Sequence, residues 1–241
     1  MRVLILAAGY GTRLKPITNT LPKCLVEVGE KPLLQHWLEK LENCYIKPTK
    51  VYVNLFYKKE MVEVFLENYQ TSLQIHHLVE EKLLGTGGTL FKLINQEHDE
   101  DLLVIHCDNF FIDSLDQFLQ ESKEKIKNQD YQLSLIAFRS STPETCGTIE
   151  INDEGEILRF QEKIKYPATN LANGAIYFFP SNYLKIIAKD YPTLEDIARD
   201  LLEPNTAKTF AFETKEFFCD IGTPQALKKA QRYIQRNQIF K

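Results

Sequence analysis

Residues 3–23 read VLILAAGYGTRLKPITNTLPK, an apolar run of strand length that passes directly into a glycine-rich segment with basic side chains. The apolar residues 3–8 predict a buried strand. Glycines placed right behind such a strand let the backbone turn sharply and bring its N–H groups close to a ligand, and a row of N–H groups forms an anion-binding concavity. The order of these features predicts a loop that binds a polyphosphate.

The spacing of the glycines separates this loop from two other phosphate-binding patterns. A P-loop requires G-x-x-x-x-G-K-[ST], whereas Lys15 lies between Leu14 and Pro16. A dinucleotide fingerprint requires a third glycine where Leu14 stands, and Pro16 and Pro22 prevent a regular helix directly behind the loop. The alternative without function is a surface loop with incidental glycine and lysine.

The composition is that of a soluble globular protein. At 241 residues, with 44% hydrophobic and 26% charged residues, the chain fits one large domain or two small ones and is long enough to bury a substantial core. The net charge of -4 argues against a general nucleic-acid or membrane-surface binder, because such proteins usually carry a basic excess. We therefore expect no nucleic-acid or membrane partner, and any anion site must be local.

The cysteines indicate a reducing compartment. Their number is odd and they show neither C-x-x-C nor Cys/His ligand spacing, which favours reduced thiols over a disulfide frame or a zinc site. The N-terminal apolar run is too short for a signal peptide or a membrane span. A cytoplasmic location is expected. The five cysteines are Cys24, Cys44, Cys107, Cys146 and Cys219.

Strand and helix patterns alternate along the first 140 residues. Such alternation predicts an α/β fold, a Rossmann-like doubly wound and mostly parallel sheet with helices on both faces. The expected strands are 3–8, 50–54, 73–79, 102–106 and 132–138, and the expected helices are 32–44, 61–69, 89–95 and 115–128.

The period of the pattern changes in the second part of the chain. Residues 147–151 and 157–160 flank a turn at Asn152–Gly155 and predict a hairpin. Thr193 with Asp196 predicts a capping box for a helix that ends near residue 202. The other expected elements are strands 171–179, 206–212 and 217–220 and helices 181–189 and 225–236.

Two acids follow predicted strands. Asp108 comes after strand 102–106 and Asp220 lies near the end of a late strand. Ligands of doubly wound sheets bind beyond the carboxyl ends of strands, and Mg²⁺ is usually held by one or two carboxylates together with substrate phosphates. We therefore expect both acids to share one Mg²⁺, although a lone Asp at a strand end is more often a turn or cap residue.

The pattern Gly9-x-Gly11-Thr12-Arg13-Leu14-x-Pro16-x-Thr18, followed by Pro22-Lys23, resembles the signature of the sugar-1-phosphate nucleotidylyltransferases. Residues 9–26 look most like mannose-1-phosphate or heptose-1-phosphate guanylyltransferases. The resemblance implies one nucleotidyltransferase domain of GT-A-like fold over residues 1–241, with a nucleotide-binding half (1–140) and a sugar-phosphate half (141–241) that contains a small antiparallel portion. It implies Mg²⁺-dependent transfer of a nucleotidyl group from an NTP to a sugar 1-phosphate, in the supply of nucleotide sugars for cell-surface polysaccharide.

The resemblance also implies roles for individual residues. Catalysis is assigned to Arg13, Lys23, Asp108 and Lys163, and metal binding to Asp108 and Asp220. The nucleotide is assigned to Ala7, Ala8, Gly9, Gly11, Thr12, Arg13, Gly85 and Gly87, with residues 84–88 as a loop that lines the base pocket. The sugar phosphate is assigned to Gly147, Glu162, Lys163, Asn173 and Gly174.

Several alternatives stay open from the sequence. The chain could be a uridylyl- or thymidylyltransferase for another hexose 1-phosphate, or a cytidylyltransferase for a non-sugar phosphate such as phosphocholine. A catalytically silent ligand-sensing subunit is a third alternative, although it would be expected to lack Arg13, Lys23 or one of the acids. The sequence does not decide between a monomer and a homo-oligomer.

Overall fold

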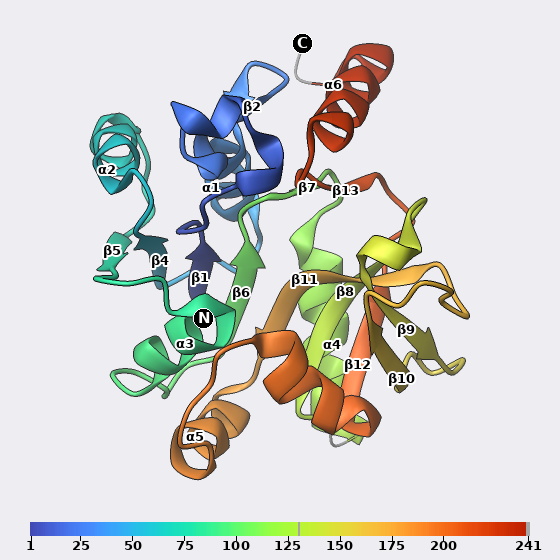
Figure 1. Ribbon diagram of the computed structural model, residues 1–241. Helices are drawn as coiled ribbons and strands as arrows, with labels where there is room; N and C mark the ends of the chain where they lie inside the picture. The colour runs from blue at the N-terminus through green and yellow to red at the C-terminus, as the bar shows by residue number, and fades with distance from the viewer. Residues whose placement is uncertain (130, 240–241) are drawn as a thin grey trace.

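A computed structural model describes residues 1–129 and 131–239, and a single large sheet runs through it (Figure 1). In the amino-terminal part, β1 (Arg2–Leu6) pairs in parallel with β4 (Lys50–Leu55) on one side and β6 (Leu102–His106) on the other. β4 pairs in parallel with β5 (Ile75–Val79). The order β5-β4-β1-β6 brings the carboxyl ends of four parallel strands to one edge.

The second part of the sheet is mostly antiparallel. β11 (Leu171–Phe179) pairs antiparallel with β6 and with β8 (Leu133–Arg139), and so joins the two parts. β12 (Thr209–Glu213) extends β8 in parallel, while β9 (Gly147–Ile151) and β10 (Ile157–Glu162) form the expected hairpin. The predicted α/β, Rossmann-like fold with a small antiparallel portion is confirmed.

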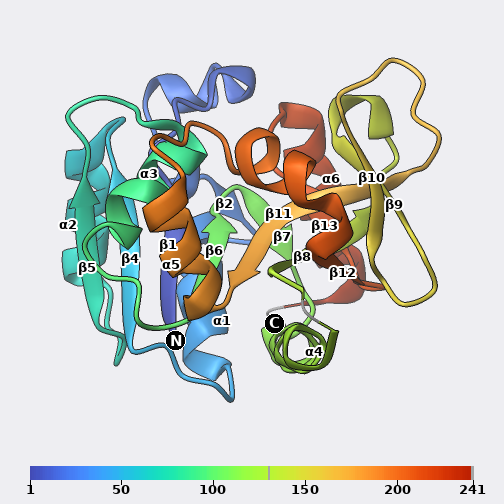
Figure 2. The same ribbon diagram turned by 90° about the horizontal axis from the view of Figure 1, so that it is seen from below.

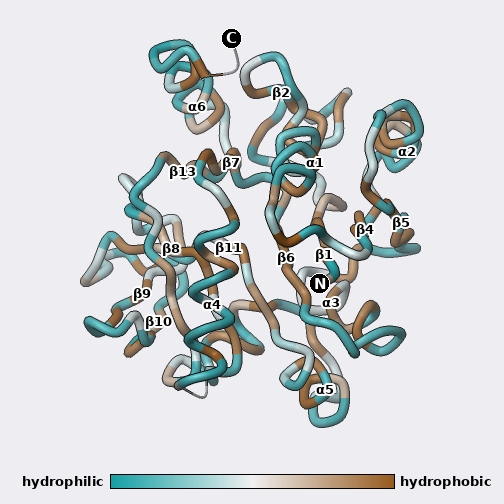
Figure 3. Tube along the Cα trace, turned by 180° about the vertical axis from the view of Figure 1, so that it is seen from behind, coloured by the Kyte–Doolittle hydropathy of each residue, from teal (hydrophilic) through white to brown (hydrophobic). Residues whose placement is uncertain are grey.

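Helices cover both faces of the sheet, which explains why β1 is apolar at every central position (Figure 2). Val3 and Ile5 are buried in one hydrophobic cluster and Leu4 in the other. Figure 3 shows hydrophilic and hydrophobic residues mixed along helices such as α4 and α6. The first cluster includes α1 (Leu33–Asn43), α2 (Lys59–Asn68), α4 (Leu115–Gln129) and α6 (Pro224–Asn237), and the second includes α3 (Gly85–Ile94) and α5 (Ser181–Asp190).

A separate two-stranded ribbon lies beyond the carboxyl end of β6. It pairs β7 (Asn109–Phe111) with β13 (Phe218–Asp220) in antiparallel register, with Asp220 opposite Asn109. A second short pair, β2 (Glu27–Val28) and β3 (Lys31–Pro32), precedes α1. The β7–β13 ribbon therefore brings two chain segments more than a hundred residues apart to the same edge of the sheet.

Two predicted boundaries at this edge are wrong for identifiable reasons. Strand β1 ends at Leu6 rather than at residue 8, because the N–H groups of Ala7 and Ala8 bond to a side chain instead of a neighbouring strand. Helix α3 begins at Gly85, not at residue 89. Residues 85–88 thus form the first turn of a helix rather than the predicted loop.

Other corrections fall between α5 and β12. Thr193 does not cap a helix; instead the Asp196 carboxylate accepts a bond from the Arg199 N–H (3.0 Å), and a π-helical turn covers Ala198–Leu202. The predicted strand 206–212 begins only at Thr209, because residues 203–208 form a 3₁₀ helix. None of the helices in the described part of the chain combines the length and the apolar character that crossing a membrane requires.

Candidate active site

The glycine-rich loop behind β1 is folded tightly against the residues that follow it. Gly11 has a φ of +63°, and a Cβ there would stand 2.8 Å from the Thr18 Cγ2 and 3.1 Å from the Lys23 Cβ. The Thr18 hydroxyl donates to the Gly11 carbonyl (2.8 Å). At Gly9, by contrast, a Cβ would meet no atom within 4 Å. Gly11 is therefore required by the turn, whereas Gly9 leaves space free beside the backbone.

A buried side chain of β4 holds the start of this loop. The Asn54 Oδ1 accepts bonds from the N–H groups of Ala7 (2.6 Å) and Ala8 (3.2 Å). Its Nδ2 donates to the Glu80 carboxylate (2.9 Å), which also accepts from the Leu84 N–H (3.1 Å). This network connects the loop after β1 with the start of α3. Its only signal in the sequence is a polar residue inside an apolar strand.

A cavity of about 310 Å³, here called the nucleotide cavity, lies along the carboxyl edge of the parallel strands. The structure brings nine of the predicted site residues together in its lining: Ala7, Ala8, Gly9, Gly11, Thr12, Arg13, Lys23, Gly85 and Asp108. Additional lining residues that the sequence did not single out for this cavity are Leu6, Cys24, Asn54, Leu83, Thr86, His106, Cys107 and Gly222.

Two cations and two acids converge at one end of the nucleotide cavity. The Lys23 ammonium contacts the Asp108 carboxylate directly and lies 4.0 Å from the Asp220 Oδ1. The Arg13 Nη2 lies 3.9 Å from the Asp220 Oδ2. The β7–β13 ribbon positions both acids, because Asp108 immediately precedes β7 and accepts a backbone bond from the Ile221 N–H (2.8 Å). The predicted convergence of Lys23, Asp108 and Asp220 is thus present in the geometry.

The two acids have opposite electrostatic environments. Burial acts to raise the pKa of Asp108, but the adjacent Lys23 ammonium outweighs it and holds that pKa below its ordinary value. Burial, together with the negative charge of Asp108, raises the pKa of Asp220 to about 6, although Lys23, Arg13 and Lys163 oppose the shift. The Asp220 Oδ1 is enclosed and has no hydrogen-bond partner in the described part of the chain. A carboxylate in this state gains from an additional cation.

These observations test whether Mg²⁺ fits here. Mg²⁺ needs only one or two carboxylates when substrate phosphates supply further oxygens. Asp108 and Asp220 provide two acids at one point, and the enclosed Asp220 Oδ1 lacks a donor. Within residues 1–129 and 131–239 no cluster of three or more His, Cys, Asp or Glu side chains could form an all-protein metal cage. The donor set therefore suits a metal that arrives with a phosphate ligand.

The predicted sugar-phosphate residues lie partly together. The Lys163 ammonium pairs with the Glu162 carboxylate at 2.8 Å, and Lys163 also acts electrostatically on Asp220. A Cβ at Gly147 would stand 2.6 Å from the Glu162 Oε2. Gly147, Glu162 and Lys163 thus form one group on the β9–β10 hairpin, and Lys163 links it to the acids.

Asn173 and Gly174 are engaged by the protein itself. The Asn173 amide donates to the Tyr177 hydroxyl (2.8 Å), and its oxygen accepts from the Ala175 N–H (2.9 Å). A Cβ at Gly174 would stand 2.7 Å from the Ile136 carbonyl oxygen. Close packing between β11 and β8 therefore accounts for the glycine at 174.

Gly87 is not part of the nucleotide cavity lining. It is buried in α3, donates its N–H to the Glu195 carbonyl (3.0 Å), and a Cβ would stand 2.7 Å from the Asp196 nitrogen. A Cβ at Gly85 would likewise stand too close to this segment, 2.4 Å from the Glu195 carbonyl oxygen. Unlike Gly87, however, Gly85 lines the nucleotide cavity. The observed contacts of Gly87 are packing contacts, and its nucleotide-binding role stays a prediction.

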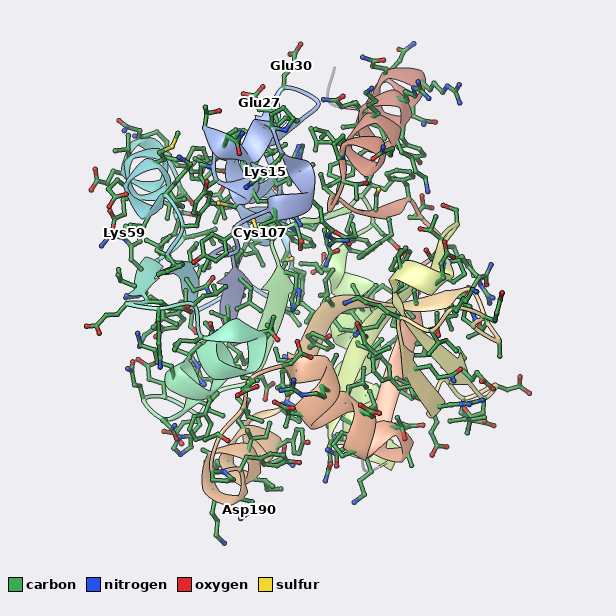
Figure 4. All side chains as sticks on the ribbon, in the orientation of Figure 1. Lys15, Glu27, Glu30, Lys59, Cys107 and Asp190 are labelled. Carbon is green, nitrogen blue, oxygen red and sulfur yellow. The ribbon has the colours of Figure 1, made fainter. Side chains whose placement is uncertain are left out.

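His106 is a cavity residue that the sequence did not single out. It ends β6, two residues before Asp108, and its Nε2 has no hydrogen-bond partner among the described residues. Burial lowers the pKa of the imidazole, against the charge of Asp108. Cys107, labelled in Figure 4, marks this end of β6 near the centre of the molecule. A polar residue at the end of an otherwise apolar strand was the available signal.

Comparison with known proteins adds independent information. The family model for nucleotidyl transferase matches residues 2–237. The chain is 29% identical over 240 residues to the bifunctional protein GlmU of Methanocaldococcus jannaschii, covering 97% of this chain and 54% of GlmU. It thus spans about half the length of that relative.

A relative of similar length and a solved structure agree with this match. The D-glycero-alpha-D-manno-heptose 1-phosphate guanylyltransferase of Aneurinibacillus thermoaerophilus is 27% identical over 237 residues, which cover 98% of this chain and 99% of that protein. The crystal structure of HddC from Yersinia pseudotuberculosis superposes with a TM-score of 0.78 at 25% identity, covering 97% and 99% of the two chains, and HddC has also been solved with GMP-PN.

These matches confirm the GT-A-like fold and the family expected from residues 9–26. With the glycine loop, Lys23 and Asp108 lining one cavity, Asp220 beside Lys23, and a family match along nearly the whole sequence, the chain belongs to the nucleotidyl transferase family.

Proposed function

We propose that this protein transfers a nucleotidyl group from an NTP to a sugar 1-phosphate, and releases pyrophosphate. The convergence of Lys23 and Arg13 with Asp108 and Asp220, at the end of a cavity lined by the glycine loop, carries the proposal. A polyphosphate needs such cations, and paired acids beside them suit its accompanying metal.

The charges of the substrates determine what the protein must do. A sugar 1-phosphate is already an anionic nucleophile, so its attack on the α-phosphorus requires no general base. The protein must align two anions and stabilise the charge that develops on the departing pyrophosphate. Basic side chains and backbone N–H groups supply that stabilisation.

Each cation of the site has a distinct place in this proposal. Arg13 and the backbone of residues 9–12 bind the β- and γ-phosphates. Lys23, whose side chain is 13% exposed, lies between the two acids and neutralises the reacting phosphates together with Lys163. When substrate binds, Lys23 exchanges part of its contact with Asp108 for a phosphate oxygen.

Mg²⁺ is proposed as the metal, held by Asp108 and Asp220. Bound there with an NTP, it would neutralise phosphate charge at the leaving group. Asp220 is suited to this role because its carboxylate is enclosed beside another acid, with one oxygen lacking a hydrogen-bond donor. Asp108 in turn is kept ionised by Lys23.

We propose GTP with a mannose- or heptose-type 1-phosphate as the substrates. The full-length similarity to a heptose-1-phosphate guanylyltransferase and to HddC, which was solved with GMP-PN, supports this pair. Glu162 beside Gly147 supports a sugar acceptor, because a carboxylate can accept bonds from sugar hydroxyls. The free cysteines support a cytoplasmic location.

Pyrophosphate release from each NTP tests the proposal directly. The purified protein would be assayed with a panel of sugar 1-phosphates and with phosphocholine, with and without Mg²⁺. We expect release with GTP and a manno-configured sugar 1-phosphate only when Mg²⁺ is present. If pyrophosphate is released only with CTP and phosphocholine, the acceptor is phosphocholine and not a sugar 1-phosphate. If no combination of NTP and acceptor releases pyrophosphate, the proposed activity is refuted.

A further inference from the structure

A second cavity, of about 330 Å³, adjoins the nucleotide cavity and shares Arg13 and Gly222 with it. We call it the hydroxyl cavity, because five hydroxyl side chains line it. Four of them lie between β8 and β9, namely Ser140, Ser141, Thr142 and Thr145, and the fifth is Thr223, the N-cap residue of α6.

Gly222 keeps the boundary between the two cavities narrow. A Cβ at this position would stand 2.8 Å from the Arg13 Nη2 and 3.1 Å from the Asp220 Oδ1. The guanidinium therefore lies against the backbone at Gly222, with its side chain 60% exposed. Arg13 can contact a ligand that extends from the nucleotide cavity into the hydroxyl cavity.

The opposite wall carries a second cation, Lys229 of α6. Its ammonium contacts the Ser141 hydroxyl at 3.4 Å, and within residues 1–129 and 131–239 it forms no ion pair with a carboxylate. Arg13 is only weakly paired, since its guanidinium lies 3.9 Å from its nearest carboxylate, that of Asp220. Two weakly paired cations that face one cavity favour an anionic ligand.

Hydroxyl groups in this cavity can donate further hydrogen bonds to an anion. The Ser141 hydroxyl accepts from Lys229, so its own proton remains available as a donor. The Ser140 hydroxyl accepts from the Thr142 N–H at 3.1 Å and also lies 3.5 Å from the Cys146 Sγ. The carboxylate of Asp220 also lines this cavity and opposes an anion, but the proposed Mg²⁺ would neutralise it.

We propose that the hydroxyl cavity is a subsite for pyrophosphate, with Lys229, Ser141 and Arg13 as its ligands. This inference rests on the proposed function. In that reaction a phosphate oxygen of the sugar 1-phosphate forms a bond to the α-phosphorus, the bond from the α-phosphorus to the bridging oxygen breaks, and its electron pair leaves with pyrophosphate. The leaving group begins beside Arg13, and the hydroxyl cavity opens from there.

Pyrophosphate has two phosphoryl groups, and two cations, Arg13 and Lys229, line this cavity. One group stays on Arg13 while the other reaches Lys229 and the Ser141 hydroxyl. Orthophosphate can engage only one end of this arrangement, so the subsite should prefer pyrophosphate. Because the reaction is reversible, the same contacts bind pyrophosphate when it attacks a nucleotide sugar.

Direct binding measurements on two neighbouring lysines test the subsite. Lys229→Ala is compared with Lys228→Ala, which removes an exposed lysine of the same helix that does not line the cavity. Titration calorimetry with Mg-pyrophosphate should show roughly ten-fold weaker binding for Lys229→Ala, the effect of losing one hydrogen bond to a charged group. Lys228→Ala should bind as the unmodified protein does.

Ser141→Ala and orthophosphate provide the second arm. Ser141→Ala should weaken pyrophosphate binding two- to five-fold, and orthophosphate should bind more weakly than pyrophosphate and respond little to Lys229→Ala. Equal losses for the two lysine variants, or equal affinity for orthophosphate and pyrophosphate, would overturn the subsite. In the reverse reaction, the Michaelis constant for pyrophosphate should rise in Lys229→Ala and stay unchanged in Lys228→Ala.

The calorimetric arm does not depend on turnover. If no NTP and sugar 1-phosphate pair reacts but Lys229→Ala still weakens pyrophosphate binding selectively, the proposed function fails and the subsite stands. If nucleotidyl transfer occurs but Lys229→Ala does not weaken pyrophosphate binding, the subsite proposal is refuted and the proposed function stands.

Discussion

Lys23→Ala is the substitution that most directly tests the arrangement of the active site. The ammonium contacts the Asp108 carboxylate and lies 4.0 Å from the Asp220 Oδ1, and the side chain is only 13% exposed. Loss of one preorganised charge contact to a developing negative charge typically lowers the rate by about 10²–10³, or about 2.7–4 kcal/mol. We expect at least this loss in the rate of pyrophosphate release at saturating substrates.

The same change should also affect folding stability, because it leaves Asp108 without its counter-ion. Breaking a fully buried pair costs about 3–5 kcal/mol, and the 28% exposure of the Asp108 side chain should reduce the loss to about 1–3 kcal/mol. The double variant Lys23→Ala/Asp108→Asn removes the uncompensated charge. Urea unfolding should show that the double variant regains most of the lost stability.

Activity and stability therefore separate in these two variants. Pyrophosphate release should stay at least as low in the double variant as in Lys23→Ala, although its free energy of unfolding recovers. A folded Lys23→Ala protein with near-normal turnover would refute the assigned role of Lys23. A double variant that recovers activity along with stability would show that the defect of Lys23→Ala was structural.

Three further predictions concern the acids, the loop support and the glycines. The pKa of Asp220 is raised to about 6, so kcat/KM should fall as the pH drops below about 6, because the protonated acid binds Mg²⁺ poorly; steady-state rates of pyrophosphate release across this pH range measure the fall. In the metal-free protein this acid takes up a proton on folding between its unfolded pKa and about 6, so its contribution to stability should instead decrease as the pH rises through that window, which calorimetric unfolding without Mg²⁺ measures. Asn54→Ala should lower the free energy of unfolding by about 2–4 kcal/mol in urea titrations, because it leaves the buried Ala7 N–H without its acceptor and disrupts the network behind the loop. A loss below about 0.5 kcal/mol would contradict the supporting role of Asn54. Gly87→Ala should lower the free energy of unfolding by about 1–3 kcal/mol, because the added methyl group overpacks this position. Gly9→Ala should change that free energy by no more than about 0.5 kcal/mol but weaken nucleotide binding; a larger loss of stability for Gly9→Ala than for Gly87→Ala in thermal unfolding would contradict the space seen beside each glycine.

Much of the nucleotide-binding part was predictable because its signals are local. The apolar run of β1 and the glycine spacing behind it lie within one stretch, so the loop, Arg13 and Lys23 could be located from sequence. Asp108 and Asp220 were found by their positions after strands. Their meeting depends on the β7–β13 ribbon, a long-range pairing that no local pattern specifies.

The features that the sequence missed depend on tertiary contacts. Asn54 lies in a strand and gains its role only because the loop after β1 passes over it. Gly87 and Gly174 match motif glycines, yet backbone carbonyl and amide groups of other segments occupy the space beside them. A glycine that admits a ligand and one that admits a neighbouring backbone are identical in sequence.

The β7–β13 ribbon has a consequence for biosynthesis. Asp220 reaches its partner only through three residues of β13, which are made after all nine strands of the main sheet. A chain emerging from the ribosome can therefore assemble its glycine loop early but should remain without a complete pair of acids until β13 has docked on β7. We expect nascent chains halted before residue 218 to be unable to consume nucleotide, however well the parallel strands have formed.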